Sequence, residues 1–286
     1  MPPLRLMAIL AHPDDESLGF GGALARYASE GIETSLVCAT LGQRGRMRGK
    51  PPGDPEHPGP DRMAEIREAE LRNAAKELGI QDVSLLGYMD GAVDQVDPRA
   101  AHVAIATQVR RVRPHVAMSF GPEGAYGHPD HIAVSQFALA ALVLAADPSF
   151  ETPDHLAPHA VSKFYYQVST VASWQAYQDA FKRLVSMVDG VERMAVAWPD
   201  WQVTTVIDTA AQWETVWRAV SCHDSQVGAY DKLKTLSPEQ HSALWGRQHY
   251  YRVFSTVNGG RAIESDLFEG LRGERPTPRN FQEVVR

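Results

Sequence analysis

The sequence predicts an α/β protein with a Rossmann-like, mostly parallel central sheet flanked by helices, and with extra C-terminal strands and helices. Short apolar runs alternate with longer segments of helical periodicity through the first half of the chain. This alternation is typical of β–α units that build a parallel sheet. The apolar runs have the length of strands that are buried on both faces.

The expected elements follow one another in a regular order at first. Strands are expected at 4–11, 33–40, 82–87 and 116–120, and helices at 17–29, 61–78, 98–112 and from 131 onward. Gly79 suits the C-terminal cap of the helix at 61–78. After residue 150, strands are expected at 164–170, 203–208 and 250–257, and helices at 209–221 and 237–247. No linker divides the chain, so we expect one domain over 1–286, with a site-bearing core at 1–150 and an elaboration at 151–286.

The composition excludes several classes of protein. The chain is 44% hydrophobic and 22% charged, as in an ordinary globular protein, and its formal net charge of −7 argues against a nucleic-acid partner. Two cysteines are too few for a disulfide framework. The N-terminal run lacks the layout of a signal peptide, and the apolar stretch 132–146 is too short to span a bilayer. We therefore expect a cytoplasmic protein.

Polar residues follow two of the predicted strands. The segments 12–16 and 126–131 should meet at the carboxyl edge of the sheet, where α/β proteins bind their ligands. The first segment holds His12 and the consecutive acids Asp14, Asp15 and Glu16, which repel one another unless a cation joins them. A helix N-terminus would explain one or two acids but not the histidine as well. We favour a metal site.

The second segment adds Tyr126, His128, Asp130 and His131. Two histidines and one carboxylate form a catalytic zinc arrangement with positions left open, and iron(II) suits the same ligands. The set also describes the facial triad of iron(II) oxygenases. A further carboxylate beside the ligands suits hydrolysis better, because it can act as a base.

At these residues the chain resembles the PIG-L/LmbE-like deacetylases. AHPDDESLGFGG and GAYGHPDH match the two signatures of that family, and weaker likenesses are TLGQRG at 40–45, IREAELRNAAKELG at 66–79, LGYMDG at 86–91 and CHDSQ at 222–226. The resemblance implies a zinc- or iron(II)-dependent enzyme that removes the N-acetyl group from a small N-acetylglucosamine-type sugar conjugate. Because such enzymes are often oligomeric, it also favours a homo-oligomer.

The resemblance further implies a role for each matching residue. His12, Asp15 and His131 would bind the metal, and Asp14 would be the general base. His128 and Tyr126 would assist at the carbonyl oxygen, and Asp130 would orient a neighbouring histidine. Substrate contacts would come from Arg67, Asp90, His223 and Gln226. For Asp90, a role in the turn Met89–Gly91 is an equal explanation.

The segment 42–62 is rich in Gly, Pro and Arg and has no apolar periodicity. A loop of this length is either a mobile surface segment or functional. As a lid it would offer Arg44, together with Arg46, Arg48 or Lys50, to a polar or anionic part of the substrate. Neutralising the three arginines would then raise KM.

Two other functions remain open at this point. One is an amidase that acts on a thiol conjugate of the same kind of sugar. The other is a protein that binds metal and sugar without turnover. The presence of both Asp14 and His128 argues against the second, because binding alone needs neither a base nor a proton donor.

Overall fold

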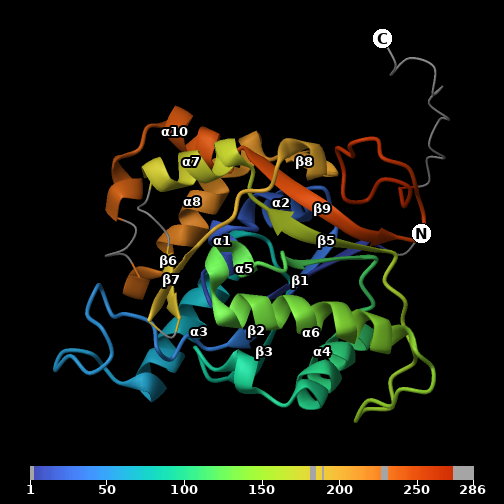
Figure 1. Cartoon of the computed structure of the whole chain (residues 1–286), viewed down its shortest axis with the longest axis horizontal. Helices are drawn as coiled ribbons and strands as arrows, with labels where there is room; N and C mark the ends of the chain where they lie inside the picture. The colour runs from blue at the N-terminus through green and yellow to red at the C-terminus, as the bar shows by residue number, and fades with distance from the viewer. Residues whose placement is uncertain (1–2, 181–184, 189, 227–230, 273–286) are drawn as a thin grey trace.

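The computed structural model describes residues 3–180, 185–188, 190–226 and 231–272. In these residues a seven-stranded sheet has the order β3-β2-β1-β4-β5-β9-β8 (Figure 1). Its strands are β1 (Arg5–Leu10), β2 (Glu33–Thr40), β3 (Asp82–Tyr88), β4 (Val116–Phe120), β5 (Lys163–Val168), β8 (Thr205–Asp208) and β9 (Arg247–Ser255). β1 to β5 are parallel, and β8 and β9 form an antiparallel extension. The expected mostly parallel sheet with extra C-terminal strands is confirmed.

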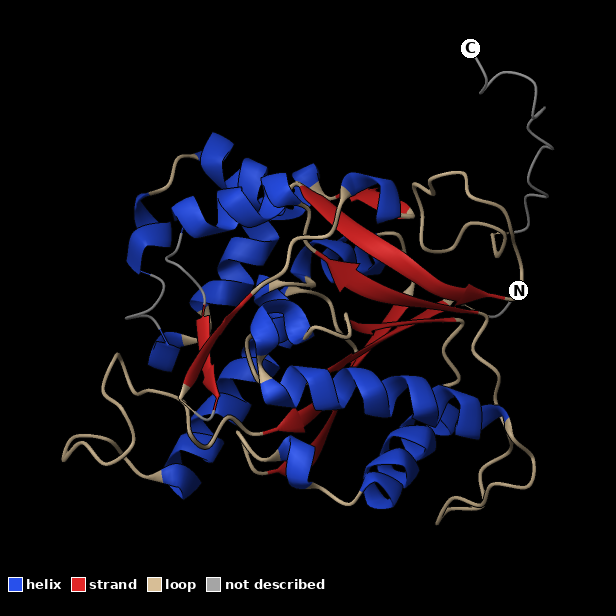
Figure 2. Cartoon of the chain, viewed as in Figure 1, coloured by secondary structure: helices blue, strands red, loops and turns tan. Residues whose placement is uncertain are grey.

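Helices cover both faces of this sheet (Figure 2). α6 packs on β4 and α4 on one face, whereas α2 packs on β2 and α8 on the other, with α3 beside α8. The helices are α1 (Asp15–Leu18), α2 (Gly21–Ser29), α3 (Pro60–Glu77), α4 (Pro98–Val112), α5 (Gly124–Gly127), α6 (Pro129–Ala146), α7 (Val171–Ala180), α8 (Trp213–Ser221) and α10 (Pro238–Trp245). Short 3-10 turns are η1 (Val93–Gln95), η2 (Asp200–Gln202), η3 (Ala210–Gln212), η4 (Asp224–Gln226) and η5 (Asp231–Thr235).

The strands at the centre of the sheet are buried along nearly their whole length. Every residue of β1 except Arg5 is buried, and all of β4 is buried. Parallel strands between two helical layers face apolar side chains on both sides, so they read as continuous apolar runs. For this reason the strand bounds predicted from the sequence lie close to the observed ones.

Three regions differ from expectation. The helix expected at 17–29 is two helices, α1 and α2, separated at Gly19 and Phe20. At Gly22 an added Cβ would come within 2.8 Å of Thr209 Cβ, so the glycine allows α2 to pack closely there. α7 and the hairpin of β6 (Val185–Val188) and β7 (Val191–Met194) were not predicted, because α7 is only weakly amphipathic and the hairpin strands are short.

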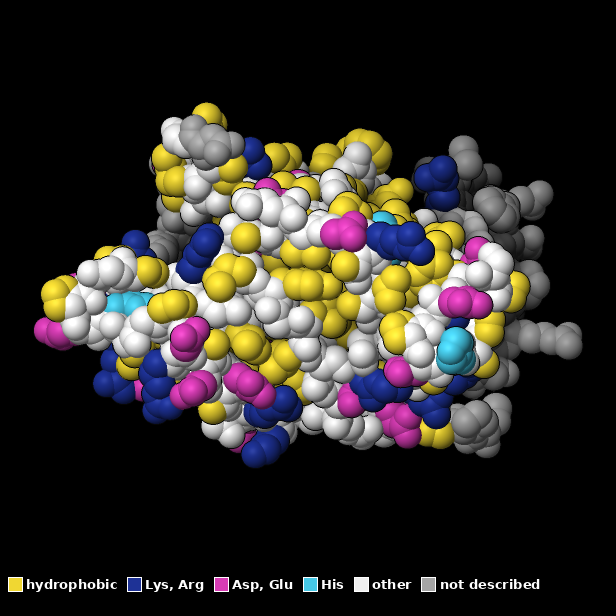
Figure 3. Space-filling view, turned by 90° about the horizontal axis from the view of Figure 1, so that it is seen from below, with side chains coloured by type: hydrophobic (Ala, Val, Ile, Leu, Met, Phe, Trp, Pro, Cys, Tyr) yellow, Lys and Arg dark blue, Asp and Glu magenta, His cyan; other side chains and the backbone are white. Residues whose placement is uncertain are grey.

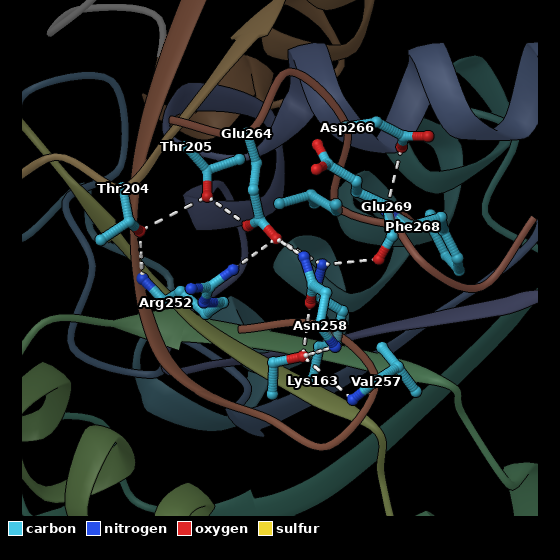
Figure 4. A network of polar contacts seen from close by, with 12 residues as sticks. Lys163, Thr204, Thr205, Arg252, Val257, Asn258, Glu264, Asp266, Phe268 and Glu269 are labelled. Atoms are coloured by element: carbon cyan, nitrogen blue, oxygen red, sulfur yellow. Dashed lines mark hydrogen bonds and ion pairs between the residues drawn. The ribbon is translucent and has the colours of Figure 1, made fainter. Parts of the chain in front are cut away.

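The segment that follows β9 is fixed by one buried carboxylate, Glu264 (Figure 4). Its side chain accepts hydrogen bonds from Lys163 Nζ, Tyr165 Oη and Arg252 Nη1, each at 2.7 Å, and from Thr205 Oγ1 at 2.8 Å. These partners lie on β5, β8 and β9. Glu264 therefore fastens the C-terminal segment to three strands of the sheet.

In the described part of the chain, α6 is the helix with the length and apolar composition of a membrane span. It is 18 residues long, longer than the stretch judged from the sequence, and 56% of it is buried inside the protein. Its packing against α4 and β4 accounts for its apolar side chains. Figure 3, which views the molecule from below, shows basic and acidic side chains interspersed around an apolar centre on that face.

Candidate active site

The first polar motif forms a tight turn at the end of β1. Asp14 has φ 112° and ψ −24°, a left-handed conformation that is strained for a residue with a side chain. The His12 N–H donates to Asp15 Oδ2 at 2.7 Å, and the Asp14 N–H donates to Glu16 Oε2 at 2.9 Å. These bonds stabilise the turn, and the carboxylate of Glu16 accepts one of them inside the protein.

The second motif forms a similar turn after the neighbouring strand, β4. Ala125 has φ 61°, and His128 caps α6 because its Nδ1 accepts the Asp130 N–H at 3.2 Å. His131, in the first turn of α6, stacks on Phe120 with the ring centroids 4.0 Å apart. Because β1 and β4 are adjacent and parallel, both motifs lie at the carboxyl edge of the sheet, as predicted.

Three side chains from the two motifs converge on one point. His12 Nδ1 lies 3.1 Å from His131 Nε2 and 3.6 Å from Asp15 Oδ2, and His131 Nε2 lies 3.4 Å from Asp15 Oδ1. Ligand atoms around a tetrahedral zinc ion stand about 3.4 Å apart, given the usual metal–ligand distances. The donor set and its spacing therefore fit a divalent metal.

The other nitrogen of His12 faces two buried carboxylates. His12 Nε2 lies 3.1 Å from Asp130 Oδ2 and 3.3 Å from Asp90 Oδ1. Asp130 also accepts the N–H groups of Gly91 and Val93, at 2.6 and 3.1 Å. These carboxylates could join His12 in an alternative cation group, as could His128 with His12 and His131. We place Asp130 behind His12, because backbone donors already occupy both of its oxygens.

The protonation of the cluster suits a cation. Burial alone would raise the pKa of Asp15, but the hydrogen bonds and the charge of His12 hold it well below its usual value. Burial would also raise the pKa of Asp90, but the hydrogen bond from His12 lowers this pKa to about 2. Burial lowers the pKa of His131 to about 3, so this ring is neutral, as a ligand must be. On His12 the neighbouring carboxylates outweigh burial and raise the pKa, so a metal would displace a proton there.

Asp14, the expected base, pairs with a buried arginine. Arg67 Nη2 lies 3.0 Å from Asp14 Oδ2 and donates to the Pro13 carbonyl. Arg67 is 4% exposed and fits against Gly42 and Gly45, where an added Cβ would meet its guanidinium. The structure thus places Arg67 behind Asp14, and its direct contact with a sugar stays a prediction.

His128 and Tyr126 lie beside the proposed ligands. Because His128 Nδ1 accepts a backbone N–H, its neutral ring carries the proton on Nε2. Burial and the nearby His12 lower the pKa of His128, which favours a neutral hydrogen-bond donor over a cationic ring. The Tyr126 ring stands edge-on to His131 with the centroids 5.3 Å apart, and burial raises the pKa of its hydroxyl well above 10.

The structure places the remaining predicted substrate contacts away from the cavity. Arg44 donates its backbone N–H to Asp90 and its guanidinium to the Gly91 carbonyl. His223 is fully buried and bonds through Nε2 to Glu16 at 2.7 Å, and its contact with the substrate stays a prediction. Gln226 Nε2 donates to the Arg46 carbonyl at 2.7 Å.

The segment 42–62 is tied to the turn at 223–226. Besides Gln226, the Arg48 N–H donates to the Ser225 carbonyl at 2.6 Å, and the Arg48 guanidinium pairs with Asp224. Ser225 in turn donates to Glu70 of α3. The turn at 223–226 therefore joins the segment 42–62 to α3, which no local sequence pattern could reveal.

A cavity of about 270 Å³ opens in front of the proposed ligands. Asp14, Asp15, Tyr126 and His131 line one side of it. The opposite side comes from α7 and the start of β9, with Trp174, Tyr177, Arg247 and His249. This second wall was not predicted, because its residues show no motif and its elements lie far from 12–16 along the chain.

Comparisons with known proteins identify the family of this chain. A model of the family described as GlcNAc-PI de-N-acetylase matches residues 7–142. A 1D-myo-inositol 2-acetamido-2-deoxy-alpha-D-glucopyranoside deacetylase from Kineococcus radiotolerans is 33% identical over 309 residues, covering 94% of this chain and 83% of the relative. The chain therefore belongs to the PIG-L/LmbE-like deacetylase family.

Solved structures show the same fold at lower identity. An N,N'-diacetylchitobiose deacetylase from Pyrococcus horikoshii has a TM-score of 0.61 and 20% identity, covering 84% of this chain and 76% of its own. A 4-carboxy-2-hydroxymuconate hydratase from Pseudomonas putida has a TM-score of 0.64 and 18% identity, covering 91% of this chain and 100% of its own. Because a hydratase shares the fold, the site and not the fold must identify the reaction.

Proposed function

We propose that this protein is a zinc-dependent N-deacetylase that releases acetate from an N-acetylglucosamine-type sugar conjugate. The observation that carries the proposal is the triangle formed by His12 Nδ1, Asp15 and His131 Nε2, with Asp14 beside it at the wall of a cavity. The activities named for the Kineococcus and Pyrococcus relatives support the substrate class. Iron(II) fits the same ligands, so zinc is the choice to be tested.

His12, Asp15 and His131 would hold the metal, and Asp130 would orient His12. A bound divalent metal lowers the pKa of water and polarises a carbonyl group. Asp14 takes the proton from the attacking water, and its partner Arg67 fixes the direction of the carboxylate. His128 Nε2–H and the Tyr126 hydroxyl donate toward the carbonyl oxygen as it gains negative charge. The proton on Asp14 is then available to the departing amine.

A second arrangement of the substrate would place a different amide at the same residues. This is the amidase of a thiol–sugar conjugate, and it makes the same demands on Asp14 and His128. The curated relative is named as a deacetylase, so we give the acetyl amide priority.

The test is the release of free amine from a panel of N-acetylglucosaminides by protein that has been stripped of metal and reloaded with zinc or iron(II). Asp14→Asn is the matched control, because asparagine keeps the shape of the side chain and tolerates the left-handed conformation. We expect metal-dependent release that falls about 10²- to 10⁴-fold in Asp14→Asn, with metal content unchanged. Near-normal turnover by Asp14→Asn would contradict the base assignment.

A further inference from the structure

The wall of the cavity opposite the metal ligands takes no part in the proposed chemistry. It is formed by α7, which supplies Trp174 and Tyr177, and by the start of β9, which supplies Arg247 and His249. Figure 1 shows α7 and the first residues of β9 near each other. An acetyl group needs only the part of the cavity next to the ligands. The opposite wall is therefore available to the rest of the substrate.

Arg247 reaches this wall because of the direction of β9. β9 runs antiparallel to β5, and His249 pairs with Val168 near the carboxyl end of β5. β9 therefore begins at the edge of the sheet where β1 and β4 end. This topology brings an arginine from residue 247 to the same edge as Asp14 and His131.

The Arg247 guanidinium is exposed, and within the described part of the chain it makes no hydrogen bond or ion pair. The arginines of 42–62 differ from it, because Arg44 and Arg46 donate to backbone carbonyls and Arg48 pairs with Asp224. After burial, the charge of Arg247 is the next cause that lowers the pKa of His249, which lines the same cavity. Arg247 is thus an available cation at the cavity wall.

Flat aromatic surface lies on the same wall. The rings of Trp174 and Tyr177 stack with their centroids 5.9 Å apart and their planes 4° apart, and both side chains are half-buried. An indole face accepts the face of another ring, and a guanidinium binds carboxylate or phosphate oxygens through paired hydrogen bonds. The two features together match a ring that carries an acidic group.

We propose that this wall is an aglycone subsite, in which Trp174 supports a ring of the group linked to the amino sugar and Arg247 binds an oxyanion on that group. The inference rests on the proposed function for the identity of the sugar, and it adds that the preferred conjugates are acidic. It also moves anion recognition from 42–62, where the sequence suggested it, to β9.

The test uses two ligands that differ only in charge, the 4-carboxyphenyl and 4-carbamoylphenyl α-glucosaminides, which are already deacetylated and cannot turn over. Their dissociation constants are measured by calorimetry with the metal-loaded protein. We expect the carboxylate to bind about tenfold more tightly than the amide, since charge-assisted hydrogen bonds are the stronger kind. A 4-phosphonophenyl ligand then shows whether phosphate or carboxylate is the better oxyanion.

Matched variants assign this preference to the proposed residues. Arg247→Gln should abolish this preference, because it weakens the carboxylate ligand far more than the amide ligand, and Arg247→Lys should retain part of it. Arg261→Gln, which removes an equal charge outside the cavity, should have no effect. Trp174→Ala should weaken both ligands alike, by about tenfold, whereas Trp201→Ala, on the exposed surface, should weaken neither.

The outcomes separate the subsite from the proposed function. Equal affinities for the two ligands in the unmodified protein, or a preference that survives in Arg247→Gln, would overturn the subsite. Amine release is measured in parallel from the N-acetylated forms of both compounds. A charge preference in binding without amine release would leave the subsite standing and refute the deacetylase. Amine release without a charge preference would support the deacetylase and overturn the subsite.

Discussion

Gly42 leaves space for the arginine that pairs with the proposed base. A Cβ at this position would come within 2.7 Å of Arg67 Cδ, and Gly42 has φ 65°. Gly42→Ala should therefore displace the guanidinium from Asp14 and lower kcat, beyond the cost of backbone strain. Gly53→Ala is the control, because Gly53 also has a positive φ, 91°, but has nothing within 4 Å of the added Cβ. Equal loss of kcat in both variants would show that strain alone is responsible.

Asp130 is the residue that we expect to control metal affinity without touching the metal. It is fully buried and fixes the ring of His12 through Nε2. Asp130→Asn removes the charge from this contact and should weaken metal binding by about 10- to 100-fold. Competition with a chromophoric chelator measures the change. Asp94 is an exposed acid in η1, next to Val93, and Asp94→Asn should bind metal normally.

At the scale of elements, Glu264 joins the C-terminal segment to the sheet. Burial would raise its pKa, but the ion pair with Lys163 and the hydrogen bonds from Asn258 and Tyr165 keep the pKa below the ordinary 4.5. A carboxylate whose pKa is lower in the folded state stabilises the fold at pH values above its unfolded pKa. This contribution is lost as the pH falls through the folded pKa. Glu264→Gln should destabilise the protein by about 3–5 kcal/mol at pH 7, since it leaves buried cations unpaired.

Urea unfolding from pH 3 to pH 7 tests this contribution. The gap between the unmodified protein and Glu264→Gln should be full near neutral pH and should narrow below pH 4.5. Glu269→Gln provides a control on the same segment, because Lys163 contacts residue 269 through its backbone carbonyl and not its carboxylate. A gap that stays constant over this range would show that the charge of Glu264 does not matter.

At the scale of the whole molecule, metal binding should stabilise the fold. The proposed ligands come from the turn after β1, from α1 and from α6, so they are assembled only in the native state. A metal at 100 times its dissociation constant contributes about 2.7 kcal/mol, or roughly 5 °C in Tm for a chain of this size. A chelator should remove this increment, and His131→Ala should abolish it. His155→Ala, at an exposed histidine, should keep it.

The same melting curves address domain organisation. We propose that the chain folds as one domain, because β5 of the first half pairs directly with β9 of the second half in a single sheet. One cooperative transition, shifted as a whole by metal, is the expected result. Two transitions, of which only one responds to metal, would indicate separate units. Residues 1–2 and 273–286 of the predicted domain lie outside the described residues.

The parallel part of the sheet and the two motifs at its edge could be predicted from local sequence patterns. Buried strands such as 33–40 are continuous apolar runs, and the proposed ligands lie within short segments directly after two of them, so local patterns were sufficient. Other features required the folded structure. The pairing of Arg67 with Asp14, the burial of His223 against Glu16 and the wall formed by Trp174 and Arg247 join residues that are distant along the chain. Contacts of this kind depend on the order of strands and the packing of helices, which leave no periodic signal in the sequence.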